Sequence, residues 1–190
     1  MIYWRIQDLY DANICEQGRV DCEAYMAETG KKATDWLTAV EGLFGGVAGS
    51  VWGLGFVKKS SGAAARDALS RFVLQTAKRY TCYMFLPPHV LAKLDALLRG
   101  ATINLVPMRE ELRRLSVGEQ GSPFIRAVSL MVYVALDDRT ALNVRAVRVS
   151  EQAMLAATYR EGHAVPSTEA WKEEYQRQYD DLKGILEGDV

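Results

Sequence analysis

The stretch AAARDALSRFVLQTAKRY, residues 63–80, carries the clearest structural pattern in the chain. Ala65, Leu69, Phe72 and Tyr80 fall at helical spacing along one face. Apolar residues that recur every three or four positions are typical of an amphipathic helix, and alanine has the highest helix propensity of all residues. The stretch therefore predicts a helix with one buried face.

Other segments on both sides of this stretch also predict helices. Proline in the first turn and glycine after the last turn are typical of helix ends. Residues 89–100 follow a proline pair and end at a glycine, and residues 107–115 begin with Pro107. We also expect helices over 21–29, 33–41 and 150–161, and from Pro166 toward the C-terminus. The segments 81–86 and 101–106 are rich in strand formers and predict short strands.

Residues 124–149 predict a β-hairpin. FIRAVSLMVYVAL and ALNVRAVRV are dense in β-branched residues and flank the short polar turn 137–140. Two helical alternatives remain: Ser122-Pro123 suits a helix start, and residues 138–161 suit one continuous helix. We expect a helix-rich α+β fold, one domain over 1–190, with a small sheet packed by helices and a possible subdivision near 58–62.

Length and composition indicate a globular protein. The chain has 190 residues, of which 49% are hydrophobic and 25% charged, with a net charge of −1. These values exclude disorder as the main state, and they argue against a net-basic nucleic-acid-binding protein. The charges are unevenly distributed, because residues 58–114 hold 11 basic and 4 acidic side chains, whereas residues 150–190 hold 4 and 9. The basic middle suits an acidic partner, including the acidic end of a second copy.

The cysteines and the N-terminus indicate a reducing compartment. Cys15, Cys22 and Cys82 are odd in number and lack metal-binding spacing, so we expect free thiols without a disulfide framework or zinc. The first residues, MIYWRIQDLYD, lack the pattern of a signal peptide. We therefore expect cytoplasmic synthesis.

The segment GLFGGVAGSVWGLGFV, residues 42–57, stands out because it carries no charge. Gly45, Gly49 and Gly53 recur every four residues, and Gly42 and Gly46 form a second such pair. On a helix, this spacing leaves a groove into which another backbone fits closely. In this respect the segment resembles the glycine zippers of membrane-active proteins. Three interpretations remain open: a tightly packed core element, an interface, or a membrane contact, although 16 residues are short for a span of about 20.

Catalytic motifs give little support for an enzyme. A nucleophilic site requires a base beside the thiol, which makes Cys82 with His89 or His163 the available pairing. Neither a nucleotide-binding loop nor a metal-binding motif is present in the sequence, and we expect no cofactor.

We therefore expect a non-catalytic protein-interaction domain, such as an inhibitor, an immunity or accessory protein, or a small assembly subunit. It would act through the glycine-rich segment and a basic helix face, on another protein or on a second copy. The alternatives are a membrane-active protein that inserts 42–57 and a small enzyme with a Cys/His site. Aromatic residues and arginine are frequent interface anchors. The candidate contact residues are Gly45, Gly49, Trp52, Gly53, Arg109, Arg113, Trp171 and Tyr175.

Overall fold

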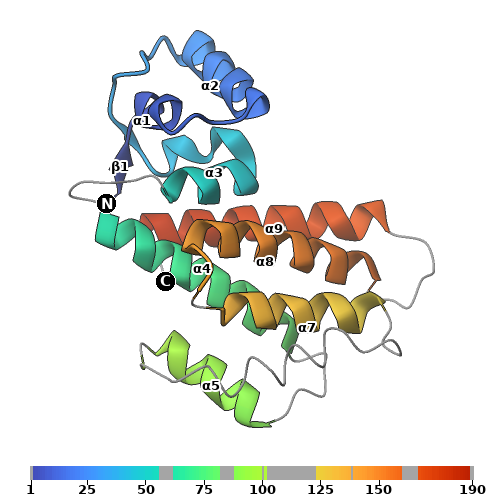
Figure 1. Ribbon diagram of the computed structural model, residues 1–190. Helices are drawn as coiled ribbons and strands as arrows, with labels where there is room; N and C mark the ends of the chain where they lie inside the picture. The colour runs from blue at the N-terminus through green and yellow to red at the C-terminus, as the bar shows by residue number, and fades with distance from the viewer. Residues whose placement is uncertain are drawn as a thin grey trace.

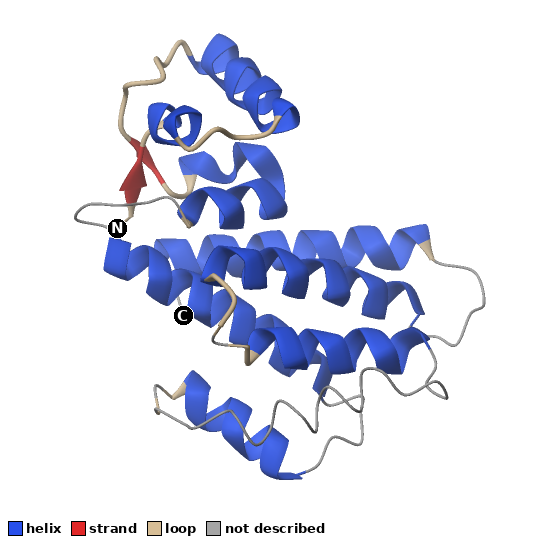
Figure 2. Ribbon diagram, in the orientation of Figure 1, coloured by secondary structure: helices blue, strands red, loops and turns tan. Residues whose placement is uncertain are grey.

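The computed structural model describes residues 2–55, 62–81, 88–99, 101, 123–137, 139–159 and 167–188. Helices dominate these residues, and one two-stranded antiparallel sheet accompanies them (Figure 2). The expected helix-rich α+β class is confirmed. No helix in these ranges combines the length and the apolarity needed to cross a membrane.

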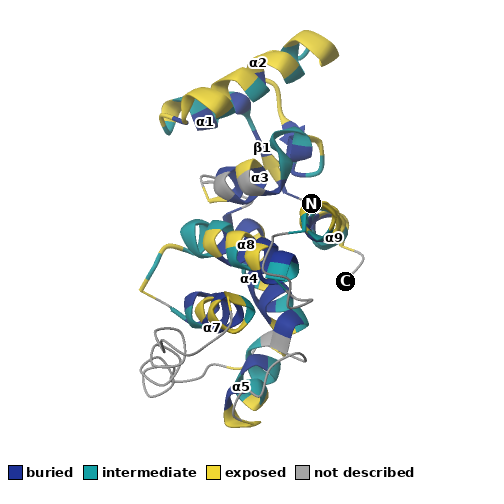
Figure 3. Ribbon diagram, turned by 90° about the vertical axis from the view of Figure 1, so that its right-hand side faces the viewer, coloured by how far each residue is buried: buried dark blue, intermediate teal, exposed yellow. Residues whose placement is uncertain are grey.

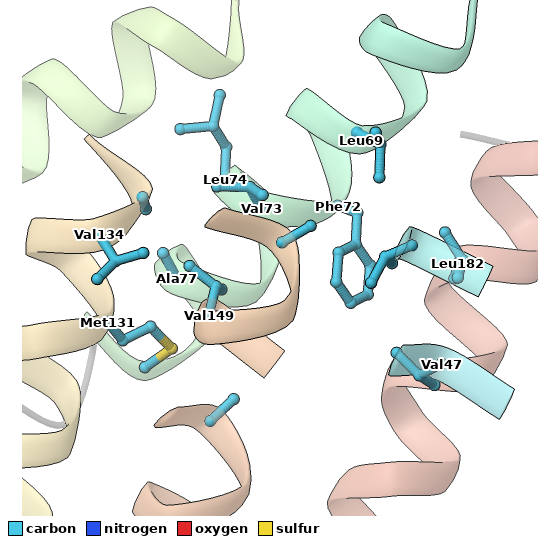
Figure 4. Packing of buried hydrophobic residues seen from close by; sticks show 14 of the residues in the cluster. Val47, Leu69, Phe72, Val73, Leu74, Ala77, Met131, Val134, Val149 and Leu182 are labelled. Carbon is cyan, nitrogen blue, oxygen red and sulfur yellow. The ribbon is translucent and has the colours of Figure 1, made fainter. Parts of the chain in front are cut away.

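Four long helices form a bundle around a shared core (Figure 1). They are α4 (Gly62–Thr81), α7 (Pro123–Ala135), α8 (Leu142–Tyr159) and α9 (Thr168–Glu187). Helix α8 lies at the centre and packs against the other three, and α5 (Pro88–Leu98) packs against α4 at the lower edge of the view. The core is mostly aliphatic: Figure 4 shows Phe72 of α4 beside Leu182 of α9, and Met131 of α7 near Val149 of α8.

The N-terminal residues form a smaller unit above the bundle (Figure 1). In chain order it contains β1 (Tyr3–Trp4), α1 (Ile6–Asp11), α2 (Glu16–Thr29), β2 (Leu37–Thr38), the 3-10 helix η1 (Glu41–Gly45) and α3 (Gly46–Leu54). Strands β1 and β2 pair in antiparallel register, with Trp4 opposite Leu37. Trp4 and Leu37 belong to a second buried cluster of Ile6, Leu9, Ile14 and Cys22, which is separate from the bundle core.

Helix α3 joins the two parts of the molecule. Its residues Val47, Val51 and Leu54 are buried in the bundle core. A Cβ placed at Gly53, on another face of the same helix, would lie 3.4 Å from Leu9 of the N-terminal cluster. Figure 3 shows α3 between α1 of the N-terminal unit and α8 of the bundle, and part of α3 is coloured as buried. Helix α3 therefore contacts both cores, and Ile2, Ala39 and Leu43 of the N-terminal residues also reach the bundle core.

The hairpin expected over 124–149 is wrong, because these residues form α7 and α8. Pro123 is the first residue of α7, where its fixed φ suits a helix and its missing N–H costs nothing. The buried residues Ala127, Val128, Met131 and Ala135 follow a helical period, so tertiary packing outweighs the β propensity of the branched residues. The helical alternative for 138–161 is closer, since α8 covers Leu142–Tyr159.

The helix expected over 33–41 is also wrong, because this segment contains β2 and a turn that leads into η1. The helices expected over 63–80, 89–100 and the C-terminal stretch are confirmed as α4, α5 and α9. Ser167 caps α9, because its side-chain oxygen accepts a hydrogen bond from the Ala170 N–H at 3.2 Å. The strands expected over 81–86 and 101–106 lie outside the described residues except for Thr81, which ends α4, and residue 101. The helix expected over 107–115 lies wholly outside them, as does most of the subdivision near 58–62.

Candidate functional site

The glycine-rich segment forms two helical pieces that meet at Gly46. Gly45 ends η1, and α3 begins at Gly46, whose backbone has φ 68° and ψ −173°. This region of the Ramachandran map is essentially restricted to glycine. The sharp change of direction at Gly46 separates Gly45 from Gly49 and Gly53, which lie on α3.

Gly42 and Gly46 lie against aromatic side chains. A Cβ at Gly42 would overlap the indole ring of Trp4, and a Cβ at Gly46 would overlap the hydroxyl oxygen of Tyr175 on α9. Glycine at these two positions is therefore a requirement of close packing. Gly46 also brings the glycine-rich segment into contact with the aromatic face of the last helix, which the sequence presents 129 residues further along the chain.

Gly45 and Gly49, in contrast, face open space. A Cβ at either residue would meet no described heavy atom within 4 Å beyond its own helix and chain neighbours. Both residues line a cavity of about 390 Å³ between the N-terminal unit and α8, which we call the glycine-lined pocket. Gly18 and Gly42 also line it.

The walls of the glycine-lined pocket are largely apolar. They are formed by Trp4, Leu9, Ile14, Phe44 and Val147. The rings of Trp4 and Phe44 are nearly parallel, with centroids 6.1 Å apart, and the Tyr25 ring also stacks on Phe44, with centroids 4.3 Å apart. This aromatic stack comes from three separate elements, and it holds the pocket wall in place.

The polar lining of the pocket comes from helix α2 and from its N-cap residue, Cys15. Cys15, Gln17, Asp21 and Cys22 line this side. Gln17 donates a hydrogen bond to Asp21 Oδ1 at 2.9 Å. Burial raises the pKa of the Cys22 thiol to about 11, and the nearby carboxylates of Asp21 and Glu23 add to this effect, so Cys22 is neutral and unreactive at pH 7.

A second hollow lies between α8 and α9, and we call it the aromatic groove. It measures about 430 Å³ and is lined by Ser150, Glu151, Gln152, Met154, Leu155, Trp171 and Tyr175. Trp171 is 45% exposed and Leu155 is 44% exposed. The rings of Trp171 and Tyr175 stack with their centroids 5.7 Å apart. Two of the three predicted aromatic contact residues, Trp171 and Tyr175, therefore line one hollow.

A buried polar network fixes the helices beneath the aromatic groove. Ser150 on α8 donates to Gln178 Oε1 at 2.5 Å, and Gln178 donates in turn to Glu174 Oε1 at 3.0 Å. Arg79 of α4 donates to the same oxygen at 2.9 Å and also pairs with Asp181. These contacts tie α4, α8 and α9 together, and Ser150 connects the network to the lining of the groove.

The negative charge of Glu174 also acts on a neighbouring phenol. Burial raises the pKa of Tyr80 above its ordinary value, and the charge of Glu174 raises it further. Tyr80 therefore stays protonated at physiological pH and acts as a buried structural residue.

The two hollows are neighbours. Tyr175 lines the aromatic groove and its hydroxyl lies against Gly46, next to Gly45 of the glycine-lined pocket. Helix α8 contributes Val147 to the pocket and Glu151 and Leu155 to the groove. These positions are four residues apart, so they lie along one stripe of α8.

The other predicted contact residues have different environments. Gly53 is buried against Leu9, and it lines neither hollow. Trp52 lies on α3, but its side chain is outside the described part of the molecule. Arg109 and Arg113 also lie outside the described residues.

Sequence reasoning missed the residues that complete the two hollows, among them Trp4, Phe44, Asp21 and Leu155. Phe44 lies within the glycine-rich segment, and that position was an available signal. Asp21 and Leu155 carry no local signal, because the packing of distant elements brings them to the hollows.

The described residues do not bring together the Cys/His pair that the enzyme alternative requires. His89 is exposed on α5, while Cys82 and His163 lie outside the description. Within the described ranges, no group of three or more His, Cys, Asp and Glu side chains could hold a metal ion. No family model, curated protein or solved structure shows significant similarity to the chain.

Proposed function

We propose that this chain is a non-catalytic protein-interaction domain that associates with a second copy of itself through the aromatic groove. The observation that carries the proposal is the exposed Trp171, which stacks on the half-buried Tyr175 and lines the groove together with the exposed Leu155. Tryptophan and tyrosine are over-represented among residues that dominate binding energy. A preorganised groove loses little conformational entropy when it is filled.

The charge distribution supports a second copy as the occupant. Glu151 is the charged residue among the described side chains that line the groove, and it belongs to the acidic C-terminal part of the chain. Residues 58–114 of another copy hold 11 basic and 4 acidic side chains, so their net charge is opposite in sign. Opposite charges that meet across an interface favour the encounter and fix the orientation of the partners.

Light scattering after size exclusion tests this proposal, at increasing protein concentration and in 50 mM and 500 mM salt. We expect a discrete oligomer that dissociates at high salt, because screening weakens exposed charge pairs. Trp171→Ala should weaken the association by about tenfold or more. Trp36→Ala is the matched control, since Trp36 is also exposed but does not line the groove.

Two results would overturn the proposal. One is a monomer at every concentration and salt condition. The other is an oligomer that Trp171→Ala leaves unchanged, because its interface would then lie elsewhere. Circular dichroism of both variants establishes that each retains the helical fold.

A further inference from the structure

We infer that the glycine-lined pocket is a binding site for a small apolar molecule that carries one positive charge, such as a protonated amine on a hydrocarbon or aromatic body. This inference does not depend on the aromatic groove or on self-association.

The size and position of the pocket are those of a ligand site. The hollow is open to solvent, since Cys15, Gln17 and Gly49, which line it, are exposed, and small-molecule sites are commonly clefts of this kind. A cavity of about 390 Å³ at the junction of two hydrophobic cores falls within the range of small-molecule sites, which is roughly 300–1,000 Å³. Such sites are mostly apolar and contain a few well-placed polar groups.

Glycine creates the free volume. Any side chain at Gly45 or Gly49 would project into space that no described atom fills, while Gly42 and Gly46 hold the surrounding aromatic residues at close range. The backbone at Gly45 and Gly49 has negative φ, so ordinary residues are allowed there. The empty space at these two positions is thus a property of the chosen residues and is not imposed by the backbone.

The charge of the ligand follows from Asp21. Among the described residues that line the pocket, Asp21 is the one with a carboxylate side chain, and it lies beside apolar walls. The Gln17 amide occupies its Oδ1 atom at 2.9 Å, and a carboxylate has further acceptor sites available to an ammonium donor. The wider surroundings are also acidic, because residues 1–57 hold 8 acidic and 4 basic side chains.

The aromatic walls suit the apolar body of the ligand. Trp4 and Phe44 line the pocket, and because their rings stack on each other and on Tyr25, they contribute apolar surface. An anionic ligand would meet the carboxylate of Asp21, which repels it. The pocket therefore combines an apolar body site with a single cation-selective group.

Three probes with one naphthyl body separate size from charge: 1-naphthylmethylamine, which is protonated at pH 7, 1-naphthalenemethanol, which is neutral, and 1-naphthoate, which is anionic. Isothermal titration calorimetry with the full chain measures each affinity. We expect the amine to bind about tenfold more tightly than the alcohol, as expected for one charge-assisted hydrogen bond, and the naphthoate to bind most weakly.

Two substitutions locate the site. Asp21→Asn should remove the preference for the amine over the alcohol, whereas Glu28→Gln, which removes a charge from an exposed position of the same helix, should leave it intact. Gly49→Leu should weaken the binding of amine and alcohol alike by about tenfold or more, because the leucine side chain fills the pocket. Gly49→Ala, which adds one methyl group, should retain most of the binding.

Alkylation of Cys15 gives an independent readout, because this exposed thiol lines the pocket. Bound amine should slow its reaction with iodoacetamide, as followed by residue-resolved mass spectrometry. Equal affinity for all three probes, an amine preference that persists in Asp21→Asn, or unchanged Cys15 alkylation would each overturn the inference. Self-association of the chain has no bearing on these outcomes.

Discussion

Two pairs of glycines alternate along the same short segment and have opposite surroundings. Gly42 and Gly46 each lie where a side chain would overlap an aromatic residue, whereas Gly45 and Gly49 face a cavity. We call Gly42 and Gly46 the closed pair, because the fold requires glycine there, and Gly45 and Gly49 the open pair, because a Cβ there would meet no described atom within 4 Å. Glycine content alone therefore gives no indication of function, and the neighbours of each glycine separate structural positions from candidate functional ones.

The largest effect is expected at Gly46. In Gly46→Ala, the alanine must adopt a backbone conformation that is essentially restricted to glycine. Its Cβ atom would also overlap the Tyr175 hydroxyl. We expect a loss of about 2–4 kcal/mol in the free energy of unfolding, measured by urea denaturation. The double variant Gly46→Ala/Tyr175→Phe should recover part of this loss, because it removes the overlap but keeps the strain. A loss below about 0.5 kcal/mol would contradict the assignment of Gly46 to the closed pair.

Gly42→Ala should have the next largest effect. Its methyl group would overlap the buried Trp4 ring, so the indole must move within a packed core. We expect a loss of about 1–3 kcal/mol. Urea denaturation measures the loss, and near-ultraviolet circular dichroism reports the displacement of Trp4. If the stability and the near-ultraviolet spectrum both stayed at wild-type values, the close contact with Trp4 would be refuted.

The pH dependence of stability tests whether Cys22, which lines the glycine-lined pocket, is shielded from water. Its pKa is about 11 in the folded chain against an ordinary value of 9.0, so folding favours the protonated thiol. The contribution of the protonated Cys22 thiol to the free energy of unfolding is fully present below pH 9, and it is lost as the pH rises toward 11. The stability difference between wild type and Cys22→Ala should therefore shrink by about 1–2 kcal/mol from pH 8 to pH 11. A difference that is constant over this range would mean that water reaches the thiol.

Gly49→Ala should have the smallest effect and the opposite sign. Its position on α3 is helical, and its Cβ would meet no described atom within 4 Å. Alanine in place of glycine within a helix stabilises by about 0.5–1 kcal/mol. Thermal unfolding should show a raised Tm for Gly49→Ala and a lowered Tm for Gly46→Ala. A destabilised Gly49→Ala variant would place Gly49 in the closed pair.

Local patterns predicted much of the fold. Alanine content predicted α4, the proline and glycine boundaries predicted α5, and the helix start at Pro166 predicted α9. The pattern failed at residues 124–149, where β-branched residues are buried in helices. Helix α8 lies at the centre of the bundle and therefore carries apolar residues on several faces. Such a helix lacks the single apolar stripe at a period of 3.6 residues by which a sequence distinguishes a helix from a strand.

Less of the candidate site than of the fold could be predicted from the sequence. Trp171 and Tyr175 were recognised by their residue types, and both line the aromatic groove. The four-residue glycine spacing grouped Gly45, Gly49 and Gly53, but the positive φ of Gly46 turns the chain between the first two, and Leu9 covers the third. A contact between Gly46 and Tyr175 depends on the packing of α3 against α9, and no local pattern encodes it.

The ion pair between Arg79 and Glu174 has a consequence for biosynthesis, because these residues are 95 positions apart. At a translation rate of about 5–20 residues per second, the ribosome adds Glu174 roughly 5–20 s after Arg79. During this interval the nascent α4 helix lacks the α9 surface that covers part of its face. A chaperone that shields apolar nascent segments would act in this window, and slower translation of the intervening codons would lengthen it.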